Sequence, residues 1–227
     1  MGSIVRPLEV FTKAAQARVT NDMGAIEMET RARAWKIKCP TAIRGCNRRL
    51  GELTKKFYKK TDCNLSQDSD VNHNDLTACL EVLSKAKAPS PTVVLGGLSG
   101  RADHTLGTLH SLVAVQSDSS WAAPPPYVII IDGENLVCVL RKGSHRFELD
   151  RSFLTGTCGI APICQTETLV TTCGFRWNLE RAPLSFGGTI STSNELASHE
   201  VAVNTSAPLI LTFELLSATT NLAEPPE

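Results

Sequence analysis

The stretch "GLSGRADH" at residues 97–104 brings together residue types that can handle phosphate. It follows a short apolar run that predicts a buried strand, and it precedes leucines at helical spacing. Gly97 and Gly100 leave backbone N–H groups open toward an anion, and Arg101 can bind phosphate oxygens with its planar guanidinium. Asp103, at the start of the helix, can hold magnesium. A glycine-rich turn in which Asp103 only caps the helix is an equally good interpretation of this segment alone.

The stretch "DSDVNHNDL" at 68–76 is a second place where polar side chains precede a predicted helix. Acidic and amide oxygens beside a helix start suit magnesium, and His73 could accept a proton. The same residue types are ordinary turn formers and helix caps, with Asn72 and Asn74 as the cap candidates. On these residues alone we favour the capping interpretation.

The stretch "FRWNLERAPLSFGGTISTSNEL" at 175–196 contains a different chemistry. A tryptophan on a predicted strand, a Gly-Gly turn and a Ser-Thr-Ser-Asn run offer a flat apolar face beside neutral hydrogen-bonding groups. A planar heterocycle would fit such a site. The alternative is a β-hairpin with a polar turn, which these residues alone favour.

The elements that must position these stretches change character near the middle of the chain. Leu76, Leu80 and Leu83 recur at helical spacing, and the run "APSP" at 88–91 ends that helix. A strand, the glycine-rich turn and a further helix follow. This order predicts part of an α/β layer that binds ligands at the carboxyl edge of its strands.

From Tyr127 onward, short strands are divided by turn residues, which predicts an antiparallel β-sandwich. Because the run "YVIII" at 127–131 could also belong to the sheet of the first half, we place the boundary after it, at "KGS" near 142–144. The predicted fold class is therefore α/β plus all-β: an incomplete α/β domain at 1–142, followed by a β-sandwich domain at 143–227.

Composition limits the classes of partner. The chain has 23 Lys+Arg and 23 Asp+Glu, so no overall charge favours nucleic acid or a membrane surface as a partner. The basic segment 44–60 fits a solvated helix face better than a polyanion-binding patch, because it lacks interleaved aromatic residues. No run is apolar enough to span a bilayer or to form a signal peptide. Eight cysteines without a C-x-x-C pair predict reduced thiols and a cytoplasmic protein.

Taken in order, these motifs resemble the thiamine pyrophosphokinase family over residues 57 to 215. Five segments carry the resemblance: "HNDLTACL" at 73–80, "GLSGRADHTLG" at 97–107, "WNL" at 177–179, "LSFGGTISTSNE" at 184–195 and "PLILTFEL" at 208–215. The resemblance implies an α/β catalytic domain and a β-sandwich thiamine-binding domain. It also implies a homodimer whose active site lies between the catalytic domain of one subunit and the β domain of the other.

The reaction implied by the resemblance is transfer of a pyrophosphoryl group from ATP to the hydroxyethyl oxygen of thiamine, with Mg²⁺ as cofactor. Asp75 resembles the acid that ends the family's D-Q-x-x-T-D motif, and Arg101 and Asp103 resemble its G-R-x-D pair. The implied catalytic residues are these three, with Asp75 and Asp103 as metal ligands. The implied ATP-binding residues are Gly97, Gly100, Arg101 and His104. The implied thiamine-binding residues are Trp177, Ser191, Ser193 and Asn194.

The N-terminal third departs from the family's pattern. Ile26 and Glu27 stand where the family's D-G-G-A-N-R loop has Asn-Arg, and Val71 replaces the glutamine of the second motif. The family's acid motif G-D-x-D-S is replaced by "GCNRR" at 45–49. Because two metal-binding carboxylates are lost and two positive charges are added, we expect weak magnesium binding and little or no AMP formation by this chain.

Overall fold

A computed structural model describes residues 4–5, 19–20, 42–45, 56, 64–67, 74–84, 92–117, 128–164 and 167–216. The chain divides into two compact units, each described by itself below. The sandwich unit comprises Met1–Thr12, Pro91–Thr105 and Tyr127–Glu227, and the parallel-sheet unit comprises Lys13–Ser90 and Leu106–Pro126. None of the helices in the described segments is long and apolar enough to cross a membrane.

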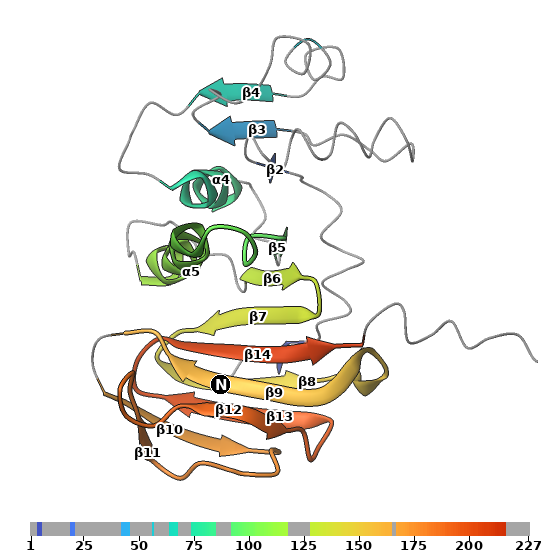
Figure 1. Cartoon of the computed structure of the whole chain (residues 1–227), viewed down its shortest axis with the longest axis vertical. Helices are drawn as coiled ribbons and strands as arrows, with labels where there is room; N and C mark the ends of the chain where they lie inside the picture. Colours follow the sequence, from blue (N-terminus) through green and yellow to red (C-terminus); the bar gives the residue numbers. More distant parts are fainter. Residues whose placement is uncertain are drawn as a thin grey trace, which may run out of the picture. The chain divides into compact units, whose positions relative to one another are not determined.

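The sandwich unit contains two sheets (Figure 1). The first has the order β12-β9-β14-β7-β6-β5, with the bounds Ser191–Glu195, Leu154–Pro162, Leu209–Leu215, Asn135–Leu140, Val128–Asp132 and Thr92–Leu95. The second has the order β1-β8-β13-β10-β11, with the bounds Ile4–Val5, Gly143–Glu148, Glu200–Thr205, Thr168–Cys173 and Ala182–Leu184. A short 3-10 helix, η2 (Arg151–Phe153), precedes β9.

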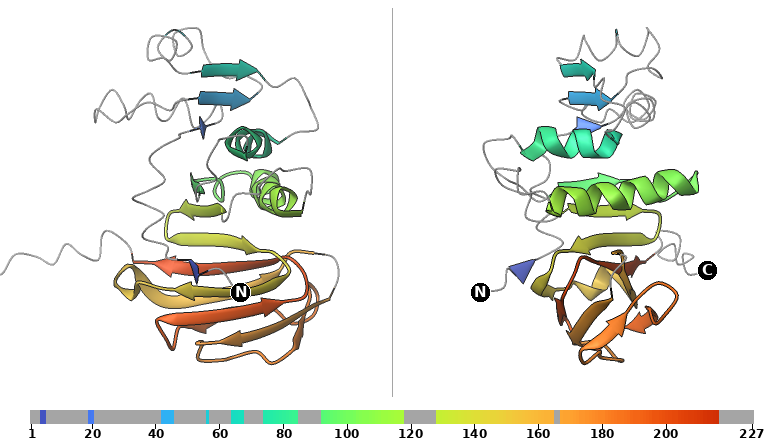
Figure 2. Two further views of the ribbon diagram at one scale, coloured as in Figure 1. Left: turned by 180° about the vertical axis from the view of Figure 1, so that it is seen from behind. Right: turned by 90° about the vertical axis from the view of Figure 1, so that its left-hand side faces the viewer.

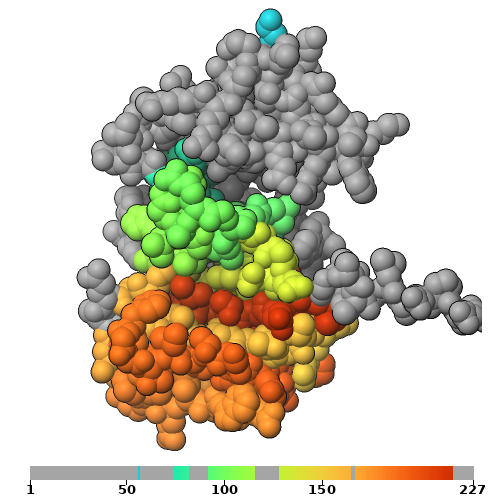
Figure 3. Space-filling model, in the orientation of Figure 1, coloured from blue at the N-terminus to red at the C-terminus, as the bar shows by residue number. Residues whose placement is uncertain are grey.

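Alternating apolar residues explain why these segments form a sandwich. In β13, Val201, Val203 and Thr205 are buried, whereas Glu200 before them and Asn204 between the last two are exposed. Such a period of two sends one set of side chains to the core and the other to solvent. Buried side chains of both sheets form one cluster, which includes Leu140, Phe147, Ile160, Val170, Leu184, Val203, Leu211 and Phe213. The predicted antiparallel sandwich is confirmed. In Figure 3 the orange residues, which lie in β10 to β13 and their connections, form a continuous surface on this face.

The six-stranded sheet continues past the sandwich strands into the strand before the glycine-rich turn. Strand β6 pairs with β5 in parallel, with Val93 opposite Ile129, and with β7 in antiparallel, with Ile129 opposite Cys138. Both views in Figure 2 show these strands side by side in green to yellow. The run "VIII" in β6 therefore has a strand on each side of it. The domain boundary at residue 142 stays a prediction, since the sheet itself does not end there.

The parallel-sheet unit contains β2 (Val19–Thr20), β3 (Ala42–Gly45) and β4 (Asn64–Gln67), which pair in parallel in this order. Helix α4 (Asp75–Ser84) packs against β2 and β3. Helix α5 (Ala102–Ser117) begins in the sandwich unit and continues in this one. Parallel strands with a helix against them confirm the α/β part of the predicted fold class, although the strand predicted for this layer, β5, belongs to the six-stranded sheet instead.

Helices α4 and α5 approach each other closely because small residues face one another. Thr77 donates its hydroxyl hydrogen to Ser111 at 2.9 Å, and the Ser111 hydroxyl donates to the carbonyl of Gly107 at 2.9 Å. A Cβ on Gly107 would lie 2.6 Å from Nδ2 of Asn74. Any larger residue at position 107 would therefore require the Asn74 side chain to shift.

Candidate active site

The glycine-rich turn leaves the sheet at the carboxyl end of β5. Gly96, Gly97 and Gly100 have φ values of +80°, +104° and +89°, in the left-handed region that glycine adopts without strain. The N–H of Gly96 still donates to the carbonyl of Ile131 at 2.8 Å, whereas Gly97 and Gly100 are more open. The backbone at Gly97 and Gly100 is thus accessible to solvent at the predicted phosphate position.

Two side chains hold this turn in shape. A carboxylate oxygen of Asp132, at the end of β6, accepts from the N–H of Leu98 at 2.7 Å. The Thr105 hydroxyl, in the first turn of α5, donates to the carbonyl of Leu98 at 3.2 Å. Sequence reasoning missed Asp132. Its signal was an acid that directly follows the apolar run "VIII".

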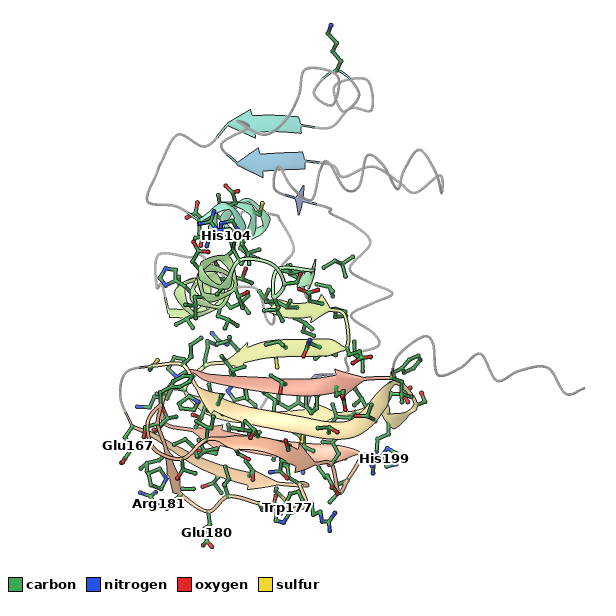
Figure 4. The ribbon with its side chains drawn as sticks, in the orientation of Figure 1. His104, Glu167, Trp177, Glu180, Arg181 and His199 are labelled. Atoms are coloured by element: carbon green, nitrogen blue, oxygen red, sulfur yellow. The ribbon has the colours of Figure 1, made fainter. Side chains whose placement is uncertain are left out.

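Arg101 and Asp103 form a two-pronged ion pair. Nε and Nη2 of Arg101 donate to the two carboxylate oxygens of Asp103 at 3.0 and 2.6 Å, and both side chains are exposed. Hydrogen bonding to Arg101 is the main cause that lowers the pKa of Asp103, and the same bonds raise the pKa of Arg101. The Arg101 carbonyl accepts from the N–H groups of His104 and Thr105 at 3.0 and 3.2 Å, which starts α5. His104, the residue after Asp103, is exposed (Figure 4).

Asp75 is the first residue of α4 and is half-buried. Asn74 caps this helix, because its side-chain oxygen accepts from the N–H of Leu76 at 3.0 Å and its carbonyl accepts from Ala78 at 3.0 Å. The expected cap at Asn74 is confirmed. Asp75 belongs to the parallel-sheet unit, whereas Arg101 and Asp103 belong to the sandwich unit.

The described residues offer magnesium single carboxylates and no cluster of ligands. Within the described segments, no three acidic, histidine or cysteine side chains gather where they could hold a metal ion. Both oxygens of Asp103 are bound to Arg101. Proteins usually hold magnesium with one or two carboxylates, and substrate phosphates and water complete its octahedral shell. The altered motifs at 22–27 and 46–49, and residues 68–73, lie outside the described residues.

Asn194 is buried, with 2% of its surface exposed, and its amide bonds the loop that carries Trp177. The side-chain oxygen accepts from the N–H of Trp177 at 3.2 Å and from its own neighbour Glu195 at 2.8 Å. The side-chain nitrogen donates to the Trp177 carbonyl at 2.9 Å and to the Ser191 hydroxyl at 3.4 Å. Asn194 therefore fixes the Trp177 backbone on both sides.

Trp177 lies in the loop between β10 and β11 and not on a strand, which corrects the expectation from its sequence pattern. The backbone is diverted at Gly174, whose φ of +89° bends the chain away after β10. The N–H groups of Ala197 and Ser198 bind the Gly174 carbonyl, so the loop is held against the segment that follows β12. Trp177 itself is 52% exposed, and Figure 4 shows it at the outer rim of the sandwich.

Ser193 stands apart from Asn194 although the two are adjacent in β12. Its φ is +57°, an uncommon value for serine, and the pairing of β12 with β9 shifts between Ser191 and Asn194. Ser193 is exposed and borders an open depression of about 270 Å³ on the six-stranded sheet. The other residues around it are Glu134, Asn135, Thr157, Cys158, Gly159, Thr192, Thr212, Phe213 and Glu214. Ser191 therefore lies beside the buried Asn194 amide, whereas Ser193 faces the open depression.

The geometry defines a protein with an open, glycine-rich turn at a strand end and an exposed tryptophan on a β-sandwich. Two family models match the same chain in the expected order. "Thiamin pyrophosphokinase, catalytic domain" matches residues 8–121, and "Thiamin pyrophosphokinase, vitamin B1 binding domain" matches residues 144–210. The chain belongs to the thiamin pyrophosphokinase family.

Curated relatives agree with this assignment, and a solved structure has the same fold. "Thiamin pyrophosphokinase 1" of Caenorhabditis elegans is 41% identical over 54% of this chain and 48% of its own length. "Thiamine pyrophosphokinase 1" of Oryza sativa subsp. japonica is 28% identical over 78% of this chain and 66% of its own length. The chain thus spans about half to two thirds of these relatives. "Thiamin pyrophosphokinase from Candida albicans" has the same fold, with a TM-score of 0.79, 16% identity and coverage of 94% of this chain and 89% of that chain.

Proposed function

We propose that this chain is a thiamine pyrophosphokinase, which transfers pyrophosphate from ATP to the hydroxyethyl oxygen of thiamine to give thiamine diphosphate and AMP. The observation that carries the proposal is the match of a catalytic and a vitamin B1 binding domain in that order on one chain. The open glycine turn and the exposed tryptophan supply surfaces for the two substrates.

On the ATP side, we assign the phosphates to the turn that contains Gly97 and Gly100. The N–H groups there and at the start of α5, beside His104, are suited to an anion. Arg101 would exchange Asp103 for phosphate oxygens when ATP binds. This exchange is easy because exposed ion pairs are weak and a polyphosphate carries more negative charge than one carboxylate.

Asp75 is the proposed group that orients the thiamine hydroxyl or accepts its proton. Asp75 and Asp103 are also the proposed magnesium ligands, because carboxylate oxygens are what this ion prefers. Since the described residues do not complete a site for it, no step is assigned to the metal. In-line placement of the hydroxyl and the phosphates would supply most of the rate in a transfer of this kind.

On the thiamine side, the exposed face of Trp177 is proposed to stack against a ring of the substrate. Ser191 and Ser193 are proposed as hydrogen-bonding groups. Asn194 is proposed to act on thiamine binding through Trp177, because its own amide is used within the protein.

A homodimer with the site between subunits is proposed from the family resemblance. Exposed apolar side chains, Phe186 at 70% and Ile190 at 40%, support it, because they would be protected in an interface. A cytoplasmic location is also proposed. It is supported by the described cysteines, Cys79, Cys138, Cys158, Cys164 and Cys173, which are all free thiols.

The second candidate is a non-catalytic, thiamine-binding or dimerising member of the family, which the loss of acids at 46–49 favours. One experiment separates the two: thiamine binding by calorimetry, combined with thiamine-dependent AMP formation from ATP and Mg²⁺. Binding with AMP formation, even slow, supports the kinase. Binding without turnover supports the second candidate, and no binding by folded protein contradicts both.

A further inference from the structure

We propose that Arg176, held by Glu195, is a positioning residue that fixes the Trp177 indole for stacking against thiamine. The inference rests on the proposed function and adds two residues that the sequence motifs did not single out. Arg176 precedes the "WNL" motif, and Glu195 follows the Ser-Thr-Ser-Asn run.

Arg176 is attached to Glu195 at both its backbone and its side chain. The N–H of Arg176 donates to the Glu195 carbonyl at 2.8 Å. Its Nη1 donates to a carboxylate oxygen of Glu195 at 2.7 Å. These two contacts give the guanidinium a defined place although the side chains are 60% and 49% exposed.

The guanidinium lies over the ring of Trp177, with its Cζ 4.7 Å from the ring centroid. This is a cation–π contact, in which the positive charge is attracted by the electron-rich face of the indole. One face of the ring is therefore covered, and the other face can meet a ligand. Trp177 stays 52% exposed in this arrangement.

Asn194 and Arg176 thus restrain Trp177 in complementary ways. Asn194 binds the N–H and the carbonyl of Trp177, which fixes its backbone. Arg176 restrains the side chain. An exposed tryptophan without such restraint would lose rotamer freedom when a ligand stacks on it, and that loss weakens binding. An indole ring that is already oriented avoids this loss of entropy on binding.

The chain provides a matched comparison. Arg146 and Glu200 also form an exposed pair between an arginine and a glutamate, with N and O atoms 3.5 Å apart and exposures of 60% and 61%. This pair joins β8 to β13, and Arg146 has no described contact with an aromatic ring. A general effect of removing a surface arginine should appear equally at both positions.

We therefore expect Arg176→Ala to weaken thiamine binding about two- to fivefold, with ATP affinity and melting temperature unchanged. Arg176→Lys should recover part of the loss, because an ammonium can still lie over the indole. Arg146→Ala should bind thiamine like the wild type. Calorimetry with thiamine and with ATP measures all three.

A double-mutant cycle with Trp177→Ala distinguishes positioning from an independent effect. If Arg176 acts through the indole, Arg176→Ala should have no further effect on thiamine affinity once Trp177 is removed. Equal losses in both backgrounds, or an Arg176→Ala protein that binds thiamine normally, would overturn the inference while leaving the proposed function intact. A folded wild-type chain that binds no thiamine would instead overturn the proposed function, and this inference with it.

Discussion

At the scale of single residues, Arg101 is the side chain whose partner should change on ligand binding. Its two bonds to Asp103 are exposed, so phosphate can replace them without uncovering a buried charge. Arg101→Ala should lower ATP affinity about tenfold or more, because charge-assisted hydrogen bonds to phosphate are lost. Thiamine affinity should change little. Calorimetry tests both, with Arg146→Ala as control, and equal loss of both ligands would indicate that Arg101 only shapes the turn.

For Asn194 we expect an effect on stability as well as on binding. Its amide is buried, and both its oxygen and its nitrogen are hydrogen-bonded within the protein. Asn194→Ala should destabilise the fold by about 1–3 kcal/mol by leaving buried partners at Trp177 unbonded. It should also weaken thiamine binding, since the Trp177 loop is released. Denaturant unfolding and calorimetry measure the two effects. A variant of normal stability that has lost thiamine binding would show direct contact with the ligand instead.

At the scale of elements, the bend after β10 has a strict requirement for glycine, because both space and backbone conformation are restricted at Gly174. A Cβ on Gly174 would collide with the backbone carbonyl of Glu200, and its φ of +89° adds strain for any other residue. Gly187 is a matched control, because its φ is +82° but nothing lies within 4 Å of a Cβ there. We expect Gly187→Ala to destabilise by about 1–2 kcal/mol and Gly174→Ala by a further ~1–3 kcal/mol. Thermal unfolding compares them, and equal losses would contradict the crowding argument.

Elements differ in how far the sequence could predict them. The strands of the sandwich were predictable where burial alternates, as in "HEVAV". Apolar and polar residues alternate there because successive side chains point to opposite faces of the sheet. The pairing of β5 with β6 was not, because a parallel pair forms between segments more than thirty residues apart. The contacts of Asp132 with Leu98 and of Arg176 with Glu195 are non-local in the same way. Local patterns identify candidate residues, whereas the partners of those residues depend on the fold.

At the scale of the whole molecule, a chain that matches both family domains carries "GCNRR" at 45–49 in place of the family's acid motif. Internal hydrogen bonds support the turn around Arg101 and the Trp177 loop, which suits the substrate-binding roles proposed for them. Residues 46–49, which stand in place of the family's acid motif, carry two arginines and no carboxylate, so magnesium binding is expected to be weak. The molecule is therefore expected to retain substrate affinity and to be limited in turnover.

Restoring the two aspartates of the acid motif tests whether their absence limits turnover. The family's motif is recreated by the combined change Cys46→Asp, Asn47→Phe, Arg48→Asp and Arg49→Ser, which adds two carboxylates and removes two positive charges. We expect thiamine-dependent AMP formation to rise at least about tenfold, since carboxylates bind magnesium and place it against the phosphates. The measurement is AMP release with and without thiamine, at several magnesium concentrations.

A second variant with serine in place of both new aspartates removes the arginines without adding ligands. If the carboxylates act as metal ligands, this control should stay slow, and only the aspartate variant should need less magnesium for half-maximal rate. Equal recovery in both would assign the effect to removal of positive charge, because the two variants differ only in the carboxylates. A folded, thiamine-binding aspartate variant with no gain in turnover would contradict the prediction and move the cause to the altered loop at Ile26 and Glu27.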